Sequence, residues 1–276
     1  MPSELHSAER LFSRHRRLSQ SEERRRAAGQ ERFSGAVSRR PSIVVLTGAG
    51  ISADSGVSTF RDPDGVWAKT DWRDVATPEG FAADPGRVHA FYNARRAGLR
   101  NVAPNAAHVA LARLERLLGD EFTLVTQNVD DLHERAGARR LLHMHGELLK
   151  ARCVFCDAVH GWAGDLTPET RCPDCKGAGG MRPDVVWFGE TPRFMDEIAS
   201  AIAGADLFVA IGTSGSVYPA AGFVMEARSV GVPCVELNLE PSENAEAFTE
   251  RRYGRAADIV PDWVAGLEAV IAQRTN

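Results

Sequence analysis

Four of the five cysteines in this 276-residue chain stand in two pairs, Cys153-x2-Cys156 and Cys172-x2-Cys175, separated by 15 residues. A C-x2-C turn directs two thiolates at one ion, so two such pairs predict a tetrahedral zinc site. Four thiolates leave no open coordination position, which makes the predicted ion structural. Disulfides are disfavoured because we find no secretory signal and expect a reducing, cytoplasmic location.

The segment around these cysteines, from about residue 147 to 182, is rich in Gly, Pro, Cys and Asp and is too short to bury a core alone. A bound metal would supply the missing stability, so we expect a small zinc-binding domain. A nucleic-acid-reading zinc ribbon is the alternative. Its basic residues, Arg152, Arg171 and Lys176, are offset by nearby aspartates, and we expect no specific nucleic-acid partner.

The rest of the chain alternates strand-like and helix-like patterns. Nearly continuous apolar runs indicate strands of a parallel sheet covered on both faces, at residues 43–46, 122–125, 207–211 and 234–237. Helical spacing of apolar residues falls between and after them, at residues 105–118, 220–230 and 261–271. The predicted fold is therefore α/β, a Rossmann-like doubly wound parallel sheet whose ligand site lies at the carboxyl ends of its strands.

The two ends of the chain differ in charge. Residues 1–41 hold ten arginines and five glutamates, net +5, which leaves −9 for the remainder of a chain of net charge −4. We expect 1–41 to be a flexible basic extension and 42–276 to be the catalytic domain, with a helical insertion at about 62–103. No apolar run approaches the ~18 residues of a membrane span, so no membrane partner is expected. Cys234, within an apolar run, is predicted to be a buried and inert thiol.

A glycine turn, Gly48-Ala49-Gly50, follows the first predicted strand and precedes a probable helix start. Glycines there let the backbone approach a pyrophosphate, and a helix N-terminus favours the anion. A plain tight turn is the alternative interpretation. Position 53 is Ala, so the full G-x-G-x-x-G of a hydride-transferring dehydrogenase is absent, and that class is disfavoured.

Several further motifs follow this turn in a fixed order. They are residues 51–61, Gln127-Asn128-Val129-Asp130, His145-Gly146, the two cysteine pairs, residues 185–190 and Gly212-Thr213-Ser214. Together they resemble the sirtuin family of NAD-dependent protein lysine deacylases from residue 42 to the C-terminus, and among its members the bacterial CobB-type, desuccinylase-like class III proteins. The resemblance implies NAD as co-substrate, one structural zinc ion and acyl-lysine proteins as substrates. Acetyl and succinyl groups would leave lysine as O-acyl-ADP-ribose, with release of nicotinamide.

The resemblance also implies roles for individual residues. His145, directly before the glycine, would be the general base, with Asn128 and Asp130 acting around the nicotinamide ribose; His108 and His133 are interpreted as structural. A histidine suits the base because its pKa lies near the operating pH. The residues implied at the NAD site are Gly48, Ala49, Gly50, Ile51, Ser52, Phe60, Arg61, Trp67, Gln127, Asn128, Val129, Asp130, Gly212, Thr213, Ser214, Asn238, Leu239, Glu240 and Ala256.

Substrate-binding residues follow from the same resemblance. The peptide would add as a strand along residues 185–190, and its lysine would enter a channel lined by Phe60, Val186 and Phe188. Acidic acyl groups would meet Ala76, Tyr92 and Arg95, because a guanidinium and a phenol bind a carboxylate while alanine leaves room. Without this context, the tyrosine and the arginine are merely an exposed i, i+3 pair on a helix.

Two other functions share these motifs. NAD activation could serve mono-ADP-ribosylation of a protein, or the chain could be a non-catalytic module that senses NAD or ADP-ribose. The second is weakened because His145 and Asn128 are both present.

Overall fold

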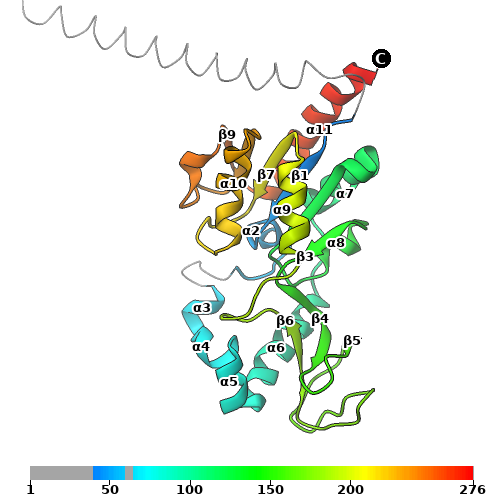
Figure 1. The fold of residues 1–276 in the computed structure, drawn as a ribbon, viewed down its shortest axis with the longest axis vertical. Coiled ribbons are helices and arrows are strands. Elements are labelled where there is room, and N and C mark those ends of the chain that lie inside the picture. Colours follow the sequence, from blue (N-terminus) through cyan, green and yellow to red (C-terminus); the bar gives the residue numbers. More distant parts are fainter. Residues whose placement is uncertain (1–39, 60–64, 276) are drawn as a thin grey trace, which may run out of the picture.

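The larger part of the molecule is a six-stranded parallel sheet with strand order β3-β2-β1-β7-β8-β9 (Figure 1). The computed structural model describes residues 40–59 and 65–275. The predicted doubly wound parallel sheet is confirmed. Its strands are β1 (Ile43–Thr47), β2 (Phe122–Thr126), β3 (Leu141–His143), β7 (Leu207–Ile211), β8 (Cys234–Asn238) and β9 (Glu250–Tyr253).

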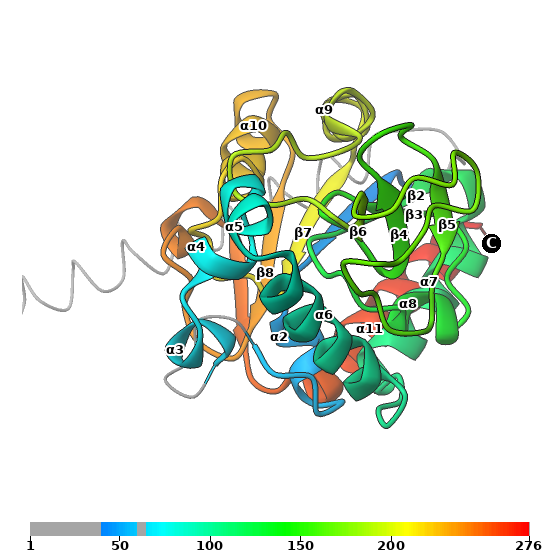
Figure 2. The same cartoon turned by 90° about the horizontal axis from the view of Figure 1, so that it is seen from below.

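Helices cover both faces of this sheet, which explains why every residue of the central strands β1 and β7 is buried. Figure 2 shows α9 (Met195–Ala203) and α10 (Phe223–Ser229) on one side of the strands, with α7 (Ala106–Leu118) and α11 (Ala256–Thr275) on the other. Successive residues of β1 accordingly enter different cores: Val44 packs with the first helix pair and Val45 with the second. The other elements of the part built on the large sheet are α2 (Gly50–Ala53), α8 (Leu132–Arg135) and the 3-10 turns Gly119–Glu121, Ala220–Gly222 and Ala245–Ala247.

Two strands of the sheet lack an apolar run of useful length and were not predicted. All four residues of β9 are exposed, and its sequence Glu-Arg-Arg-Tyr is mostly charged. β3 has only three residues. Both lie at the edges of the sheet, where one side of a strand faces water and a continuous apolar run is unnecessary.

The last helix begins earlier than the sequence predicts. The spacing of apolar residues predicts a helix over 261–271, yet α11 begins at Ala256 and contains Pro261. Asp54 caps this start from outside the helix, since its Oδ2 accepts a hydrogen bond from Ala257 N at 3.0 Å. A cap supplied from 203 residues away gives no local sequence signal.

Residues 66–99 form the helical part of the insertion. Its helices are α3 (Val66–Lys69), α4 (Trp72–Val75), α5 (Pro78–Ala83) and α6 (Pro85–Leu99). The side chains of Asp71, Thr77 and Asp84 cap the last three by accepting from backbone N–H groups. None of the described helices is long and apolar enough to cross a membrane.

The zinc-binding unit is a separate antiparallel sheet of order β5-β4-β6. It consists of β4 (Gly146–Cys153), β5 (Val159–Gly161) and β6 (Met181–Val185). Its small core contains Ala151, Leu166 and Met181 together with Cys153 and Cys172. Figure 1 shows this unit and the helices α3 to α6 side by side at one end of the molecule, below the large sheet.

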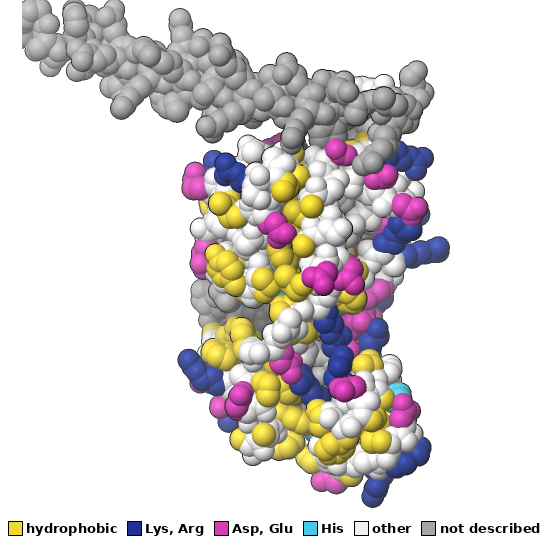
Figure 3. Space-filling view, in the orientation of Figure 1, with side chains coloured by type: hydrophobic (Ala, Val, Ile, Leu, Met, Phe, Trp, Pro, Cys, Tyr) yellow, Lys and Arg dark blue, Asp and Glu magenta, His cyan; other side chains and the backbone are white. Residues whose placement is uncertain are grey.

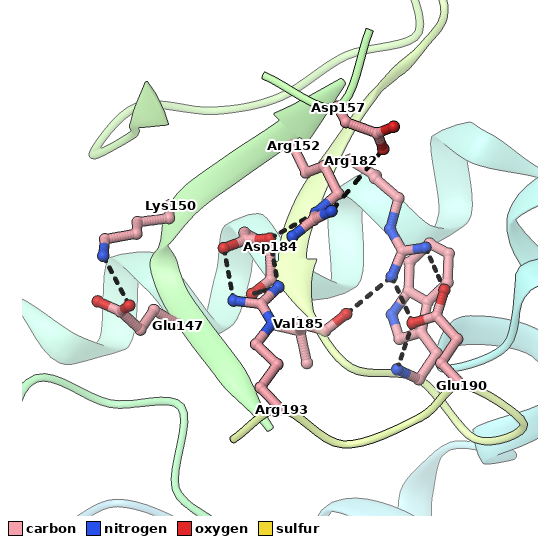
Figure 4. A network of polar contacts seen from close by, with 10 residues as sticks. Glu147, Lys150, Arg152, Asp157, Arg182, Asp184, Val185, Glu190 and Arg193 are labelled. Atoms are coloured by element: carbon pink, nitrogen blue, oxygen red, sulfur yellow. Dashed lines mark hydrogen bonds and ion pairs between the residues drawn. The ribbon is translucent and has the colours of Figure 1, made fainter. Parts of the chain in front are cut away.

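A buried carboxylate ties the zinc-binding unit to the rest of the chain. Asp184 on β6 is 2% exposed and accepts from Arg152 Nε of β4 and Arg193 Nη1, each at 2.9 Å (Figure 4). On the face drawn in Figure 3, basic and acidic side chains are interspersed at the junction of the two units. Burial alone would raise the pKa of Asp184, but the bonds from Arg193 and Arg152 outweigh it and keep the pKa below its ordinary value.

Asp184→Asn is expected to destabilise the protein by about 3 kcal/mol at neutral pH, because it leaves two partly buried guanidinium groups without their carboxylate. A carboxylate whose pKa is lower in the folded state stabilises the protein fully above its unfolded pKa of about 3.9. This stabilisation is lost as the pH falls through the pKa of the folded state. The difference in unfolding free energy between variant and wild type should therefore become smaller below about pH 4. Urea unfolding across this range is the measurement.

Glu147→Gln is the matched control, at the residue that pairs with Asp184 across the small sheet. It removes the ion pair between Glu147 and Lys150, whose side chains are 25% and 43% exposed, respectively. The free energy of unfolding should fall by at most about 0.5 kcal/mol. Equal losses in the two variants would contradict the role of Asp184.

Candidate active site

A cavity of about 710 Å³ lies where the carboxyl ends of the large sheet face the helical insertion and the zinc-binding unit. Loops after four strands contribute to it: residues 48–50 after β1, 127–129 after β2, 212–214 after β7 and 239–243 after β8. The helix α6 and residues 185–190 line the opposite side. The site thus occupies the position that a doubly wound sheet predicts.

The glycine turn packs backbone against backbone on the loop after β7. Gly50 N donates to Gly212 O at 2.9 Å, and a Cβ on Gly50 would lie 2.7 Å from Gly212 Cα. A Cβ on Gly48 would lie 2.6 Å from Gly212 O. Any side chain at either position would separate two loops that line the cavity, so the turn is required by packing as well as by any ligand.

Asn128 is held by a buried network that fixes the orientation of its amide. Its Nδ2 donates to Gly48 O at 3.1 Å and to Ser52 Oγ at 3.2 Å. Ser52 Oγ in turn donates to Asp130 Oδ2 at 3.1 Å. With both protons of the amide nitrogen directed into the protein, Asn128 Oδ1 is left as an acceptor for a group in the cavity.

His108 completes this network from α7. Its Nδ1 accepts from Asn105 N, so the proton of the neutral ring is on Nε2, which lies 3.4 Å from Ser52 Oγ. Burial lowers the pKa of His108 to about 4, so the ring is neutral at physiological pH. The structural interpretation of this histidine is consistent with its place behind the cavity wall, and His133, buried against Thr47 Oγ1 at 3.0 Å, is similar.

Among the histidines that the structure describes, His145 is the one that lines the cavity. Its Nδ1 lies 3.1 Å from Gln127 O, and a carbonyl only accepts, so Nδ1 carries the proton and Nε2 is the basic nitrogen. Burial lowers the pKa of His145, and the bond to the carbonyl opposes this only in part. Gly146, which follows, has φ +78°, and a Cβ there would lie 2.1 Å from Asp184 O. The turn that presents His145 therefore requires glycine.

His143 is turned away from the cavity. Its Nδ1 contacts Asn128 O at 3.1 Å, and its Nε2 contacts Glu134 Oε1 at 2.7 Å. Burial alone would lower the pKa of His143, but Glu134 outweighs it and the pKa is raised. A ring with both nitrogens committed, and its proton held tightly, is poorly suited to act as a base.

Tyr92 and Arg95 of α6 also line the cavity, as does Ala76. Tyr92 is 4% exposed, and burial raises its pKa to about 12. The Arg95 guanidinium carbon lies 5.6 Å from the centroid of the Phe91 ring, and burial lowers its pKa. The pair is therefore not an exposed feature of the helix surface, and that alternative is wrong.

Most of the residues implied by the resemblance border the same cavity, but three do not. Ile51, Ser52 and Asp130 are buried behind its wall. Phe60 and Arg61 lie outside the described residues. Trp67, Val186 and Phe188 all line the cavity, and Trp67 stacks on Phe91 with centroids 6.1 Å apart.

Several further residues at this cavity received no individual role from the sequence. Among them are Asp54, Thr59, Trp187, Pro192, residues 217–219, residues 241–243 and Arg255. Arg255 Nε donates to Asp54 Oδ1 at 2.9 Å, which joins the loop after β1 to the start of α11. The only available signal was the cluster of turn-forming residues after Asn238, which marks a loop at a strand end.

The four paired cysteines converge in the small unit. All four sulfur atoms lie within 4.8 Å of one another, with Sγ–Sγ distances of 3.7 Å for Cys153–Cys175 and for Cys156–Cys172. A tetrahedron with Zn–S bonds of ~2.3 Å has edges of ~3.8 Å, whereas a disulfide requires ~2.05 Å. The residues fit one zinc ion and no disulfide.

The two cysteine turns have the same backbone geometry. Asp157 N donates to Cys153 O at 2.9 Å, and Lys176 N donates to Cys172 O at 3.1 Å. These two donors directly follow the second cysteine of each pair and have φ of +58° and +63°. Positive φ is unfavourable for such residues, so each turn is held by its surroundings, as expected for thiolates drawn to a shared ion.

The fifth cysteine is separate from this cluster. Cys234 on β8 is fully buried, and burial raises its pKa to about 12. The predicted burial of this thiol is confirmed, and its raised pKa agrees with the prediction that it is unreactive.

Comparison with known proteins gives consistent matches along most of the chain. The Sir2 family model matches residues 48–219. An NAD-dependent protein deacylase of Caulobacter vibrioides is 60% identical over 230 residues, which are 82% of this chain and 97% of that protein. The protein of the same name from Escherichia coli strain K12 is 53% identical over 258 residues, 93% of this chain and 92% of that one.

Solved structures agree with the sequence matches. A Sir2 homologue in complex with NAD has a TM-score of 0.76 at 36% identity, covering 83% of this chain and 90% of its own. A complex of Sir2 with a p53 peptide and NAD+ has a TM-score of 0.70 at 27% identity, covering 83% and 93%.

Proposed function

The chain belongs to the Sir2 family, and we propose that it is an NAD-dependent protein deacylase that transfers acyl groups from lysine side chains to ADP-ribose. The observation that carries this is the cavity, where a neutral histidine base, an oriented asparagine and a glycine turn meet at the strand ends. The sequence of the chain is 60% and 53% identical to two proteins named for this activity, over most of its length, which supports the same conclusion.

The residues on the sheet side would hold NAD. Gly48 to Gly50 and Gly212 to Ser214 would contact the diphosphate and ribose, while Asn238 to Glu240 and Ala256 would contact the adenosine end. NAD supplies a ribose carbon that becomes electrophilic as nicotinamide leaves. Asn128 Oδ1 faces this end as an acceptor, suited to orient a ribose hydroxyl or a water.

His145 would act as the base. The acyl oxygen would first displace nicotinamide from the ribose carbon, which leaves a C=N bond to lysine. The unprotonated Nε2 of His145 would then accept a proton from a ribose hydroxyl, so that this oxygen adds to the C=N carbon. Addition of water and departure of the lysine amine would complete the transfer. The hydrogen bond from Nδ1 to Gln127 O stabilises the positive charge that the ring then acquires.

The acyl-lysine peptide would lie along residues 185–190. Val186 N donates to His145 O and Phe188 N to Ala76 O, while Trp187 N donates to Glu190 Oε2. Of the N–H groups from Val186 to Gly189, only Gly189 remains for a peptide carbonyl. The predicted strand addition along this segment is therefore restricted to few backbone donors. Phe188, which is 40% exposed, would shield the lysine chain.

Mass spectrometry of acetyl- and succinyl-lysine peptides, with and without NAD, tests this function. NAD-dependent loss of the acyl group and appearance of O-acyl-ADP-ribose are expected. Label from NAD that ends on protein would favour mono-ADP-ribosyl transfer instead. Binding of NAD with no turnover of any acyl peptide would favour a sensing module.

Arg95→Met is expected to lower kcat/KM for a succinyl-lysine peptide by well over tenfold. Loss of a charged, partly desolvated contact costs about 2–5 kcal/mol at comparable interfaces. Acetyl-lysine has no carboxylate, so its kcat/KM should fall far less. Steady-state kinetics on peptides of one sequence, carrying either group, measure this ratio.

The acetyl peptide is the internal control, since both substrates use one cavity and misfolding would affect both. Equal losses on the two peptides would mean that Arg95 supports the fold or the NAD site, and the proposed preference for acidic acyl groups would be rejected.

A further inference from the structure

The hydroxyl of Tyr92 has a fixed hydrogen-bond polarity. Trp187 Nε1 lies 3.0 Å from Tyr92 Oη, and the two residues are 2% and 4% exposed. An indole N–H only donates, so the phenol oxygen is the acceptor in this bond. In the part of the chain that the structure describes, no residue accepts the phenol proton, and both residues line the cavity. The phenol is therefore left to donate to a ligand.

The indole of Trp187 is itself held in place. The Arg182 guanidinium carbon lies 3.3 Å from the centroid of the Trp187 rings. Arg182 donates from Nη1 and Nη2 to the two oxygens of Glu190 at 2.6 and 2.9 Å, and from Nη2 to Val185 O at 2.7 Å (Figure 4). Glu190 also accepts from Trp187 N at 2.8 Å. Ring and backbone of the tryptophan are thus fixed by one bidentate ion pair.

This arrangement makes the acyl end of the cavity a site of donors. Arg95 can only donate, and Trp187 forces Tyr92 to present its proton. A methyl-terminated acyl group offers the phenol proton no acceptor, whereas a group that ends in a carboxylate or another acceptor does.

We propose that Trp187 is a positioning residue that determines acyl specificity by fixing Tyr92 as a donor to acyl groups that end in an acceptor. This inference rests on the proposed deacylase function and deepens it. Neither residue takes part in proton transfer. The Arg182–Glu190 ion pair acts one step further away, by holding the indole against Tyr92.

Trp187→Phe tests the inference because it keeps an aromatic ring over Arg182 and removes only the N–H donor and part of the ring. The ratio of kcat/KM for succinyl-lysine to that for acetyl-lysine is expected to fall about five- to tenfold, since one hydrogen bond to a charged group becomes poorly oriented. The change should lie mainly in KM for the succinyl peptide. Loss of packing would lower both activities and cancel in the ratio.

A double-mutant cycle with Tyr92→Phe separates positioning from an independent effect. If Trp187 acts through the phenol, adding Trp187→Phe to Tyr92→Phe should leave the ratio unchanged. A ratio that falls by the product of the two single effects, or an equal loss on both peptides in Trp187→Phe, would overturn the inference.

Two further arms keep the result decisive. Calorimetry without NAD should show that Trp187→Phe selectively loses affinity for the succinyl peptide, even if turnover were absent because the proposed function failed.

If Trp187→Phe does not fold, the indole proton resonance of Trp187 is followed by NMR in the wild type, and it is assigned by its shift in Tyr92→Phe. It should move with the succinyl peptide and not with the acetyl peptide, and an identical response to both would overturn the inference.

Discussion

His145→Asn is expected to lose nearly all deacylation while the fold and the zinc content stay intact. The asparagine amide can still donate to Gln127 O, as Nδ1 does at 3.1 Å, but it offers no basic nitrogen in place of Nε2. A positioned general base contributes about 10²–10⁴-fold to a rate, so kcat should fall by at least that order. Single-turnover rates with saturating NAD and acyl peptide measure it.

His143→Asn is the matched control, two residues away. His143 does not line the cavity and supports Asn128 through a backbone carbonyl, so its replacement should lower activity much less. The opposite order of effects would identify His143 as the base and refute the assignment of His145.

The pH profile gives a second test of the same base. His145 must be neutral to accept a proton, and burial lowers its pKa below the ordinary 6.5. Activity that depends on the neutral ring is present above this lowered pKa and declines as pH falls through it. The acidic limb of kcat/KM should therefore lie below pH 6.5, and an acidic limb above 7 would argue against His145.

Replacing Cys153 and Cys172 together by serine is expected to release zinc and unfold the small unit. Structural zinc contributes about 10–16 kcal/mol in isolated zinc-finger peptides, and this unit has few other buried residues. Because β6 leads directly into residues 185–190 of the cavity, activity should be lost with the metal. Elemental analysis and thermal unfolding of the purified protein measure both effects.

Cys234→Ser is the matched control, since it removes a buried thiol that lies apart from the cluster. It should leave one zinc ion per chain. Freshly purified wild type without metal, or a double variant that keeps its zinc, would show that the four cysteines do not form the predicted site.

The sequence alone determined the features whose physical cause is local. Strands buried on both faces need continuous apolar runs, so β1 and β7 were visible from residue type alone. Two C-x2-C pairs identify a zinc site because the spacing within each pair directs two thiolates at one ion. The turn at Gly48 to Gly50 and the site at the strand ends followed from the same kind of pattern.

Only the tertiary structure decided the features that depend on partners distant in the chain. His143 and His145 are equivalent by residue type. They differ because both ring nitrogens of His143 are hydrogen-bonded, one to Asn128 O and the other to Glu134. Trp187 meets Tyr92 across 95 residues. Hydrogen-bond polarity is set by whichever group packs against a side chain, and composition or periodicity carries no record of that contact.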